Sequence, residues 1–147
     1  IASYRAWASG KQRILYMMIN EALRPDGLDV PDIGGVIWFG KRQNQHAPGR
    51  ELTFAIRNYA GDQKRGWGQY AGQGLGTPFM QATHQHVREW YMGEKIWLDL
   101  VEGNAAAYSL YSKNGYQEIT RVPDTEHPGR NWIVMANDTV LMPNEAA

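Results

Sequence analysis

The sequence predicts a single α/β domain of the α+β type, in which a mixed sheet is covered by helices. Three observations support this fold class. A chain of 147 residues suits one domain better than two, because each of two half-length domains would have only a marginally stable hydrophobic core. Hydrophobic residues make up 43% and charged residues 20%, which supplies one buried core and argues against a disordered chain. Segments with helical and with strand periodicity alternate along the chain.

The charge and residue content exclude several function classes. Lys and Arg number 15, as do Asp and Glu, so the chain lacks a basic footprint for nucleic acid and an electrostatic reason to bind a membrane. The absence of cysteine excludes a thiolate nucleophile, a disulfide framework and Cys-ligated zinc. No apolar run reaches the roughly 18 residues that span a bilayer, and the N-terminus lacks a secretory pattern. We therefore expect a cytoplasmic globular domain with no nucleic-acid or membrane partner.

A helix is expected early in the chain, after a short strand at residues 1–6. Ser9 and Gln12 have the spacing of a capping box, in which side chains satisfy the first amides of a helix. Apolar residues then recur at the three- and four-residue steps of one helical face. They are Ile14, Leu15, Met18, Ile19 and Leu23. We predict a helix over residues 9–24, followed by a loop at 25–35 that is rich in Pro, Asp and Gly.

The middle of the chain carries two strand patterns and then a glycine-rich connection. Residues 36–39 are β-branched or aromatic, and residues 51–57 alternate between apolar and polar at the period of a half-buried strand. A turn at 44–50 is expected to join them as antiparallel neighbours. Residues 58–76 are too irregular for a helix or strand throughout, and unstructured stretches of this length in compact domains are usually functional.

The second half of the chain alternates helices and strands. The expected elements are a helix over 77–92, a strand over 96–101, a helix over 105–113, and strands over 116–122 and 131–136. Gly93 and Gly115 follow the two helices, at the position where a left-handed residue commonly ends a helix.

The glycine-rich loop at 72–77 is the first candidate binding site. It lies between an expected strand and a helix, where backbone without side chains can approach a ligand and the first amides of the helix lack partners. These donors and the helix dipole together favour phosphate oxygens, although a surface loop without a ligand is the alternative. The spacing Gly72-x-Gly74-x-Gly76 matches neither the dinucleotide fingerprint nor the P-loop, which disfavours a dinucleotide-binding enzyme.

Two motifs with fixed spacing cover this loop and the segment after it. Gln69-x-x-Gly72-x-Gly74 has the form Arg/Gln-x-x-Gly-x-Gly/Ala, and the overlapping frame Ala71-x-x-Gly74-x-Gly76 fits its surroundings better but has Ala in the first position. The second motif is Leu98-x-Leu100-x-x-x-Asn104-x-x-Ala107-x-x-Leu110-Tyr111-x-Lys113-x-Gly115-Tyr116. Together they resemble the loop and the strand–loop–helix–turn–strand signature of the GNAT superfamily of N-acetyltransferases.

The resemblance implies a fold, a co-substrate and an activity. The fold would be one domain over 1–147, with a central mixed, mostly antiparallel sheet and helices on both faces. Acetyl-CoA would bind where the fourth and fifth strands diverge, and its acetyl group would be transferred to a primary amine of a small molecule or peptide. The residues implied to hold acetyl-CoA are Ala55, Ile56, Gly72, Gln73, Gly74, Leu75, Gly76, Thr77, Asn104, Ala107 and Tyr111.

Two residues are implied to act in catalysis. Tyr111 occupies the position where many GNAT members keep a tyrosine that protonates the leaving thiolate, and its alternative is an aromatic core contact. Glu51 resembles the glutamate that some members use as a general base through water, although it also fits a solvated strand end and some members lack a dedicated base. His84 and His86 face differently on a helix, so we assign no metal.

Two functions stay open. The leading one is an acetyl-CoA-dependent N-acetyltransferase, and the alternative is a non-catalytic acyl-CoA-binding or regulatory domain on the same fold. Tyr111 and the second motif favour the enzyme. Ala71, and a segment between Ile56 and Ala71 that is longer than usual in the superfamily, favour the alternative. The amine acceptor is not identified, and a homodimer is an alternative to a monomer.

Overall fold

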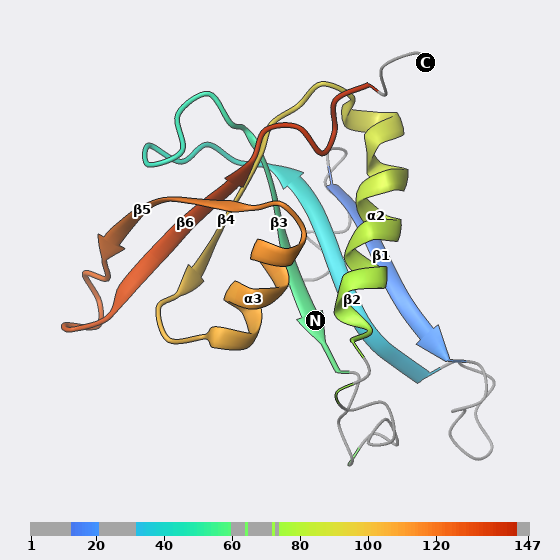
Figure 1. Cartoon of the computed structure of the whole chain (residues 1–147), viewed down its shortest axis with the longest axis horizontal. Helices are drawn as coiled ribbons and strands as arrows, with labels where there is room; N and C mark the ends of the chain where they lie inside the picture. The colour runs from blue at the N-terminus through green and yellow to red at the C-terminus, as the bar shows by residue number, and fades with distance from the viewer. Residues whose placement is uncertain (1–12, 21–31, 60–63, 65–71, 73, 144–147) are drawn as a thin grey trace.

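The computed structural model describes residues 13–20, 32–59, 64, 72 and 74–143 (Figure 1). In chain order the described elements are β1 (Arg13–Asn20), β2 (Asp32–Lys41), β3 (Leu52–Asn58), α2 (Gly76–Tyr91), β4 (Ile96–Val101), α3 (Ala105–Lys113), β5 (Gln117–Pro123) and β6 (Asn131–Asn137). Neither described helix is long and apolar enough to cross a bilayer.

The strands form one six-stranded sheet in the order β1-β2-β3-β4-β6-β5. Four neighbouring pairs are antiparallel, and β3 and β4 pair in parallel. The parallel ladder contains only the pairs Leu52–Ile96 and Thr53–Trp97, after which the two strands separate (Figure 1). The predicted mixed, mostly antiparallel sheet is therefore confirmed, with a split at its centre.

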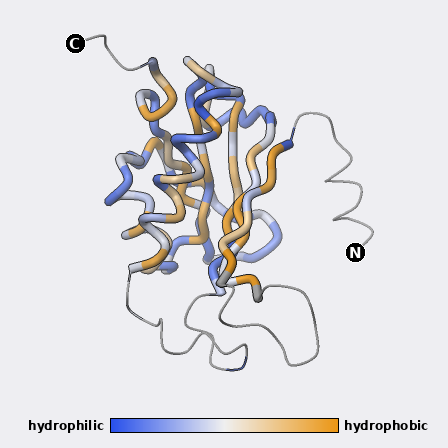
Figure 2. The backbone as a smooth tube through the Cα atoms, turned by 90° about the vertical axis from the view of Figure 1, so that its right-hand side faces the viewer, coloured by the Kyte–Doolittle hydropathy of each residue, from blue (hydrophilic) through white to orange (hydrophobic). Residues whose placement is uncertain are grey.

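Both described helices pack on one face of the sheet, where α2 covers β1 and β2 and α3 lies in front of the split (Figure 1). Helices on both faces therefore stay a prediction, because the described residues place helices on one face only. The main core lies between this face and the helices, and it includes Phe39, Phe54, Met80 and Tyr111. A smaller cluster around Trp97 lies apart from it. Hydrophobic residues concentrate along the strands accordingly (Figure 2).

The predicted helix over residues 9–24 is wrong where the structure describes it, because Arg13–Asn20 is strand β1. Ile14, Tyr16 and Met18 are half-buried and pack against the core, whereas Met17 and Ile19 are exposed, which is the period of a strand. Every residue from 14 to 19 is apolar or aromatic, so the sequence fits both periods, and pairing with the ten-residue β2 decides between them. The expected strand at 1–6 lies outside the described residues.

The other predicted helices and strands are confirmed. Their ends lie within one residue of the predicted ends, except in β2, which begins at Asp32 and is longer than the predicted strand over 36–39. β2 extends because its whole length pairs with β1 or β3 on its two sides.

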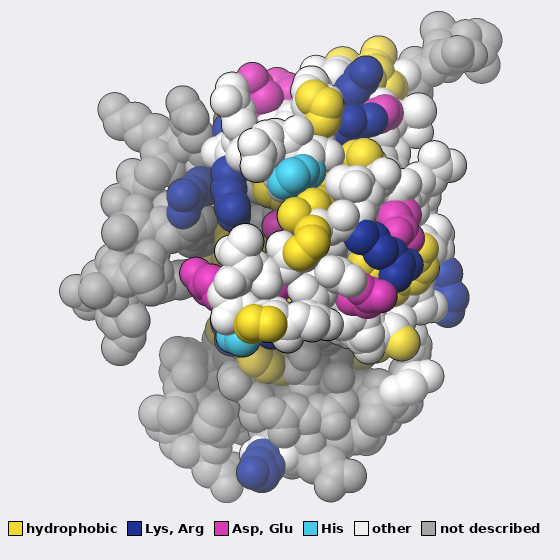
Figure 3. Space-filling view, turned by 90° about the vertical axis from the view of Figure 1, so that its left-hand side faces the viewer, with side chains coloured by type: hydrophobic (Ala, Val, Ile, Leu, Met, Phe, Trp, Pro, Cys, Tyr) yellow, Lys and Arg dark blue, Asp and Glu magenta, His cyan; other side chains and the backbone are white. Residues whose placement is uncertain are grey.

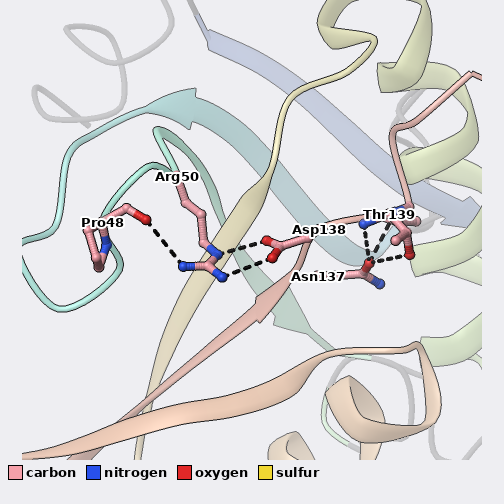
Figure 4. Close-up of polar contacts among 6 residues, drawn as sticks. Pro48, Arg50, Asn137, Asp138 and Thr139 are labelled. Carbon is pink, nitrogen blue, oxygen red and sulfur yellow. Dashed lines mark hydrogen bonds and ion pairs between the residues drawn. The ribbon is translucent and has the colours of Figure 1, made fainter.

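A forked ion pair fixes the loop between β2 and β3 to the end of β6 (Figure 4). Arg50 donates from Nε and Nη2 to the two carboxylate oxygens of Asp138, at 2.7 and 2.9 Å. The next turn is held by Asn137, whose Oδ1 accepts the backbone N–H groups of Thr139 at 3.1 Å and Val140 at 3.0 Å. Because bidentate charged hydrogen bonds fix geometry well, they hold the entry to β3 in place.

The surface on the side of β5 and β6 carries acidic and basic side chains next to one another (Figure 3). On β5, Arg121 pairs with Glu102 at 2.8 Å and with Glu118 at 2.5 Å. Charges of both signs therefore alternate over the described part of this face, and exposed pairs of this kind contribute little to stability.

Candidate active site

A pocket of about 480 Å³ opens beside the split between β3 and β4. Its lining residues come from β3, the glycine loop, the start of α2 and the segment of α3: Ile56, Asn58, Gly72, Gly74, Leu75, Gly76, Asn104, Ala106, Ala107, Leu110 and Tyr111. Since β3 pairs with β4 only as far as Thr53, the fold brings these distant segments together around an opened sheet. We call this the β3–α3 pocket.

The glycines of the loop serve two different purposes. Gly72 and Gly74 have φ values of +71° and +69°, a backbone region that favours glycine, and a Cβ atom on either would meet nothing within 4 Å. Gly76 is buried, and a Cβ atom there would lie 3.1 Å from Leu110 Cδ1 and 3.5 Å from Asn58 Nδ2. The first two therefore shape an open rim, and the third lets α2 begin close to α3.

The start of α2 is suited to an anion. Among the described residues no side chain caps this end, and its first turn contains no acidic residue. The amides of Gly76 and Thr77 are helix-terminal donors without intrahelical partners, while Phe79 N–H already bonds to Leu75 O at 3.2 Å. Helix-terminal amide donors and the positive end of the helix dipole favour phosphate oxygens here.

Tyr111 lies both in the core and on the wall of the β3–α3 pocket. Only 7% of it is exposed, and its ring meets Phe54 at 5.9 Å and Tyr116 at 6.2 Å between centroids. Burial, followed by the negative charge of Asp99, raises the pKa of Tyr111 to about 12. The phenol therefore stays protonated throughout the neutral range, as a proton donor requires.

Asn104 and Ala107 also lie on this pocket. Asn104 is the N-cap of α3, and its side-chain oxygen accepts the Ala107 N–H at 3.2 Å. The capping role and the pocket role are therefore compatible in one side chain.

Comparison with curated proteins finds similarity to acetyltransferases over part of the chain. No family model matches. The chain is 35% identical over 68 residues to an N-alpha-acetyltransferase of Sulfurisphaera tokodaii, which covers 46% of this chain and 41% of that protein. It is 39% identical over 49 residues to a spermine/spermidine N(1)-acetyltransferase of Bacillus subtilis, which covers 33% of this chain and 32% of that protein. The matches thus span under half the length of these curated relatives.

Solved structures match over nearly the whole chain. The spermidine N-acetyltransferase from Vibrio cholerae in complex with CoA and spermine superposes with a TM-score of 0.66 at 12% identity, covering 95% of this chain and 74% of that one. The ribosomal-protein-S18-alanine N-acetyltransferase from Escherichia coli gives 0.58 at 18% identity, covering 100% and 82%. The chain has the GNAT acetyltransferase fold. In this GNAT fold, β3 and β4 are the strands that the resemblance numbers fourth and fifth.

Three residues proposed from the sequence, Glu51, Ala55 and Thr77, are not among the lining residues of the β3–α3 pocket of this GNAT fold. Glu51 is exposed just before β3 and accepts a hydrogen bond from Gln43 at 3.4 Å. Ala55 lines a different pocket. Thr77 lies in the first turn of α2, and Gln73 lies outside the described residues.

That second pocket, of about 220 Å³, is lined by residues of β1, β2, β3 and β4 and by Arg42, which follows β2. Its lining includes Phe54, Trp97 and Asp99, and we call it the Trp97 pocket. Phe54 also contacts Tyr111 of the β3–α3 pocket through its ring. The two pockets are therefore neighbours across the aromatic pair at the split.

Asp99 on β4 is the candidate functional residue that the sequence interpretation missed. Its side chain keeps contact with solvent in the Trp97 pocket, yet surrounding protein raises the pKa of its carboxyl group, partly offset by the charge of Arg42. Asp99 in turn raises the pKa of Tyr111. The only signal in the sequence was one acid between Leu98 and Leu100, a pattern that any solvated strand face shows.

His84 on α2 is structural. It is 4% exposed, and its Nδ1 and Nε2 lie 2.7 Å from Met80 O and 2.6 Å from the Tyr116 hydroxyl. A carbonyl only accepts, so Nδ1 carries the hydrogen and Nε2 accepts from Tyr116. Burial lowers the pKa of His84 to about 4, so the ring is neutral. In the described ranges no three His, Asp or Glu side chains gather closely enough to hold a metal ion.

Proposed function

We propose that this chain is an acetyl-CoA-dependent N-acetyltransferase that acts on a primary amine of a small molecule. The observation that carries the proposal is the β3–α3 pocket, which is lined by most of the residues that the GNAT resemblance implies for the co-substrate. The acetyltransferase names of the curated relatives, and the CoA in the name of the Vibrio cholerae structure, support it. A cytoplasmic location and the choice between monomer and homodimer remain sequence predictions.

Acetyl-CoA fits the donors of the β3–α3 pocket. Its diphosphate would be held at Gly72 and Gly74 and by the first amides of α2, where an anion is favoured without any basic residue. Past Thr53, β3 turns backbone amide and carbonyl groups toward the split, and these suit the amides of the pantetheine arm. When bound, the co-substrate supplies an acetyl group activated as a thioester.

Asp99 and Tyr111 are proposed to move the two protons of the transfer. An Asp99 oxygen accepts a proton from the amine nitrogen, and Tyr111 donates its hydroxyl proton to the sulfur that the acetyl group leaves. Neutralising Asp99 also removes one cause of the high pKa of Tyr111, so the phenol becomes a stronger acid when its proton is needed. Glu51 stays an alternative base that would have to act through water.

The test is acetyl-CoA binding by the wild type and by two glycine variants. We expect calorimetric binding and a higher Tm in the wild type, with a gain of about 2.7 kcal/mol at roughly 100-fold excess over Kd. Gly74→Val places a β-branched residue at a φ of +69° on the pocket rim and should abolish binding. Gly129→Val is the matched control, since Gly129 has a φ of +84° in the β5–β6 loop with nothing near its Cβ position.

The outcomes separate the hypotheses. No binding by a folded wild type would remove the acetyltransferase proposal, and full affinity in Gly74→Val would remove the loop from the site. Binding without release of free CoA in the presence of any amine would support the non-catalytic acyl-CoA-binding alternative.

A further inference from the structure

The Trp97 pocket is rich in positive charge. Among its described lining residues, Arg13, Lys41 and Arg42 are cationic, and Asp99 is the one carboxylate. This charge is local, because the chain as a whole has a formal net charge of zero. The lining of the Trp97 pocket therefore carries an excess of positive charge that the net charge of the chain does not indicate.

Arg42 is held at this pocket by Trp97. Its guanidinium carbon lies 5.7 Å from the centroid of the Trp97 ring, an arrangement that a cation and an aromatic face favour. The same indole donates from Nε1 to the backbone oxygen of Arg42 at 2.9 Å, and Trp97 itself is only 1% exposed. Since the second bond is to the backbone, it survives any substitution of the Arg42 side chain.

The other two cations lie at defined places on the same pocket. Arg13 is paired with Gly40 across the β1–β2 ladder, and a Cβ atom at Gly40 would lie 3.0 Å from Arg13 Cγ. A glycine at this position thus leaves room for the arginine side chain across β2. Lys41 forms an ion pair with Glu94 at 2.8 Å, which offsets part of its charge. Arg42 is the cation whose guanidinium is positioned at this pocket by an aromatic ring, that of Trp97.

We propose that the acceptor is an amine that also carries an anionic group, a carboxylate or a phosphate, with its amine at Asp99 and its anion at Arg42. This rests on the proposed acetyltransferase function. A guanidinium binds either anion through two parallel hydrogen bonds, and the carboxylate of Asp99 both attracts an ammonium group and can accept its proton. A polyamine would instead be repelled, because its several positive charges would lie beside three cationic side chains. The acceptor class thus differs from that in the name of the Bacillus subtilis relative.

The experiment compares amine acceptors whose other end is anionic, uncharged or cationic. The panel contains γ-aminobutyrate, aminopropylphosphonate, uncharged butylamine, putrescine and spermidine, each incubated with the full chain and acetyl-CoA while free CoA is measured. We expect kcat/KM for the two anionic acceptors to exceed that for butylamine by roughly 10- to 100-fold, the range of a charged hydrogen-bonded contact. The order of carboxylate and phosphonate identifies the preferred anion.

A pair of matched variants assigns the preference to the pocket. Arg42→Gln should lower the ratio of kcat/KM for the anionic acceptors to kcat/KM for butylamine roughly 10-fold, because the contact to the anion is removed. The ratio is the readout because the charge of Arg42 also lowers the pKa of Asp99, so its loss changes the rate with every acceptor. Arg121→Gln is the control, since this exposed β5 arginine lies on neither pocket and pairs with Glu102 and Glu118. It should leave the whole panel unchanged.

The possible results distinguish the two proposals. Putrescine or spermidine equal to or better than the anionic acceptors would overturn the inference and leave the acetyltransferase function standing. An anion preference that Arg42→Gln does not reduce would also overturn it. If no amine releases CoA, the proposed function fails, and the acceptor inference fails with it.

Discussion

Replacement of Tyr111 by phenylalanine removes one hydroxyl group from the wall of the β3–α3 pocket. The ring contacts with Phe54 at 5.9 Å and Tyr116 at 6.2 Å do not depend on that hydroxyl, so we expect the core to stay packed. The substitution should change stability, because it removes a group with a raised pKa, and it should lower turnover, because it removes the proposed proton donor. The two effects occur in different pH ranges.

The stability effect belongs to alkaline pH. Burial and the charge of Asp99 raise the pKa of Tyr111 from 10.0 to about 12, and two pKa units correspond to about 2.7 kcal/mol of unfolding free energy. Because the folded pKa lies above the unfolded one, this stabilisation is complete below pH 10 and is lost as the pH rises from about 10 through 12. Tyr111→Phe lacks this titration and should lose less stability there than the wild type.

The rate effect belongs to neutral pH. If Tyr111 donates the proton to the leaving sulfur, kcat should fall roughly 10²-fold in Tyr111→Phe, while acetyl-CoA affinity changes little. Urea unfolding at neutral and alkaline pH measures the first effect, and CoA release with calorimetry measures the second. The charge of Tyr111 contributes to the raised pKa of Tyr116, so the difference between the two proteins contains the loss of that effect together with the loss of the Tyr111 titration.

Two results would refute this reasoning. Identical alkaline stability profiles for the two proteins would mean that Tyr111 does not ionise with a raised pKa in the folded state. Full turnover in Tyr111→Phe would show that water or another group protonates the sulfur, and a parallel loss of affinity and turnover would make Tyr111 a binding contact.

Two further predictions concern Asp99 and His84. Asp99→Asn should lower kcat/KM roughly 10²-fold and should also lower the pKa of Tyr111, measured by tyrosinate absorbance, whereas undiminished activity would move the base role to Glu51 or water. The pKa of His84 falls from 6.5 to about 4 on folding, so only the unfolded state gains this proton as the pH drops through that window, and up to about 3.4 kcal/mol is lost from the unfolding free energy. His84→Gln should show a shallower acid dependence than the wild type, and equal slopes would contradict the burial argument. His46→Gln is the control, because the His46 ring bonds to the uncharged side chain of Gln45.

The glycine loop and α3 could be predicted from the sequence because their requirements are local. Gly72 and Gly74 adopt positive φ values, which favour one residue type, and Asn104 caps a helix through its own side chain. Such constraints act within a few residues and leave a fixed spacing in the sequence.

Strand β1 and Asp99 could not be predicted in the same way because distant residues decide them. The apolar run in Arg13–Asn20 fits two periods, and its pairing with β2 selects the strand. Asp99 acquires its raised pKa by burial in the folded chain, which the charge of Arg42 partly offsets, and it influences Tyr111 only when β4 and α3 meet. Neither property is encoded by the local pattern around these residues.

The short ladder between β3 and β4 divides the sheet into two halves. The strands β1, β2 and β3 form one three-stranded unit and β4, β6 and β5 form the other, joined within the sheet through Leu52–Ile96 and Thr53–Trp97. Such a seam is a natural hinge, since few hydrogen bonds resist a change in the angle between the halves. A molecule that bonds to β3 on one side and contacts α3 on the other would span this hinge. A ligand in the β3–α3 pocket should therefore slow amide hydrogen exchange in both halves of the sheet at once, because it restricts the change in angle between them.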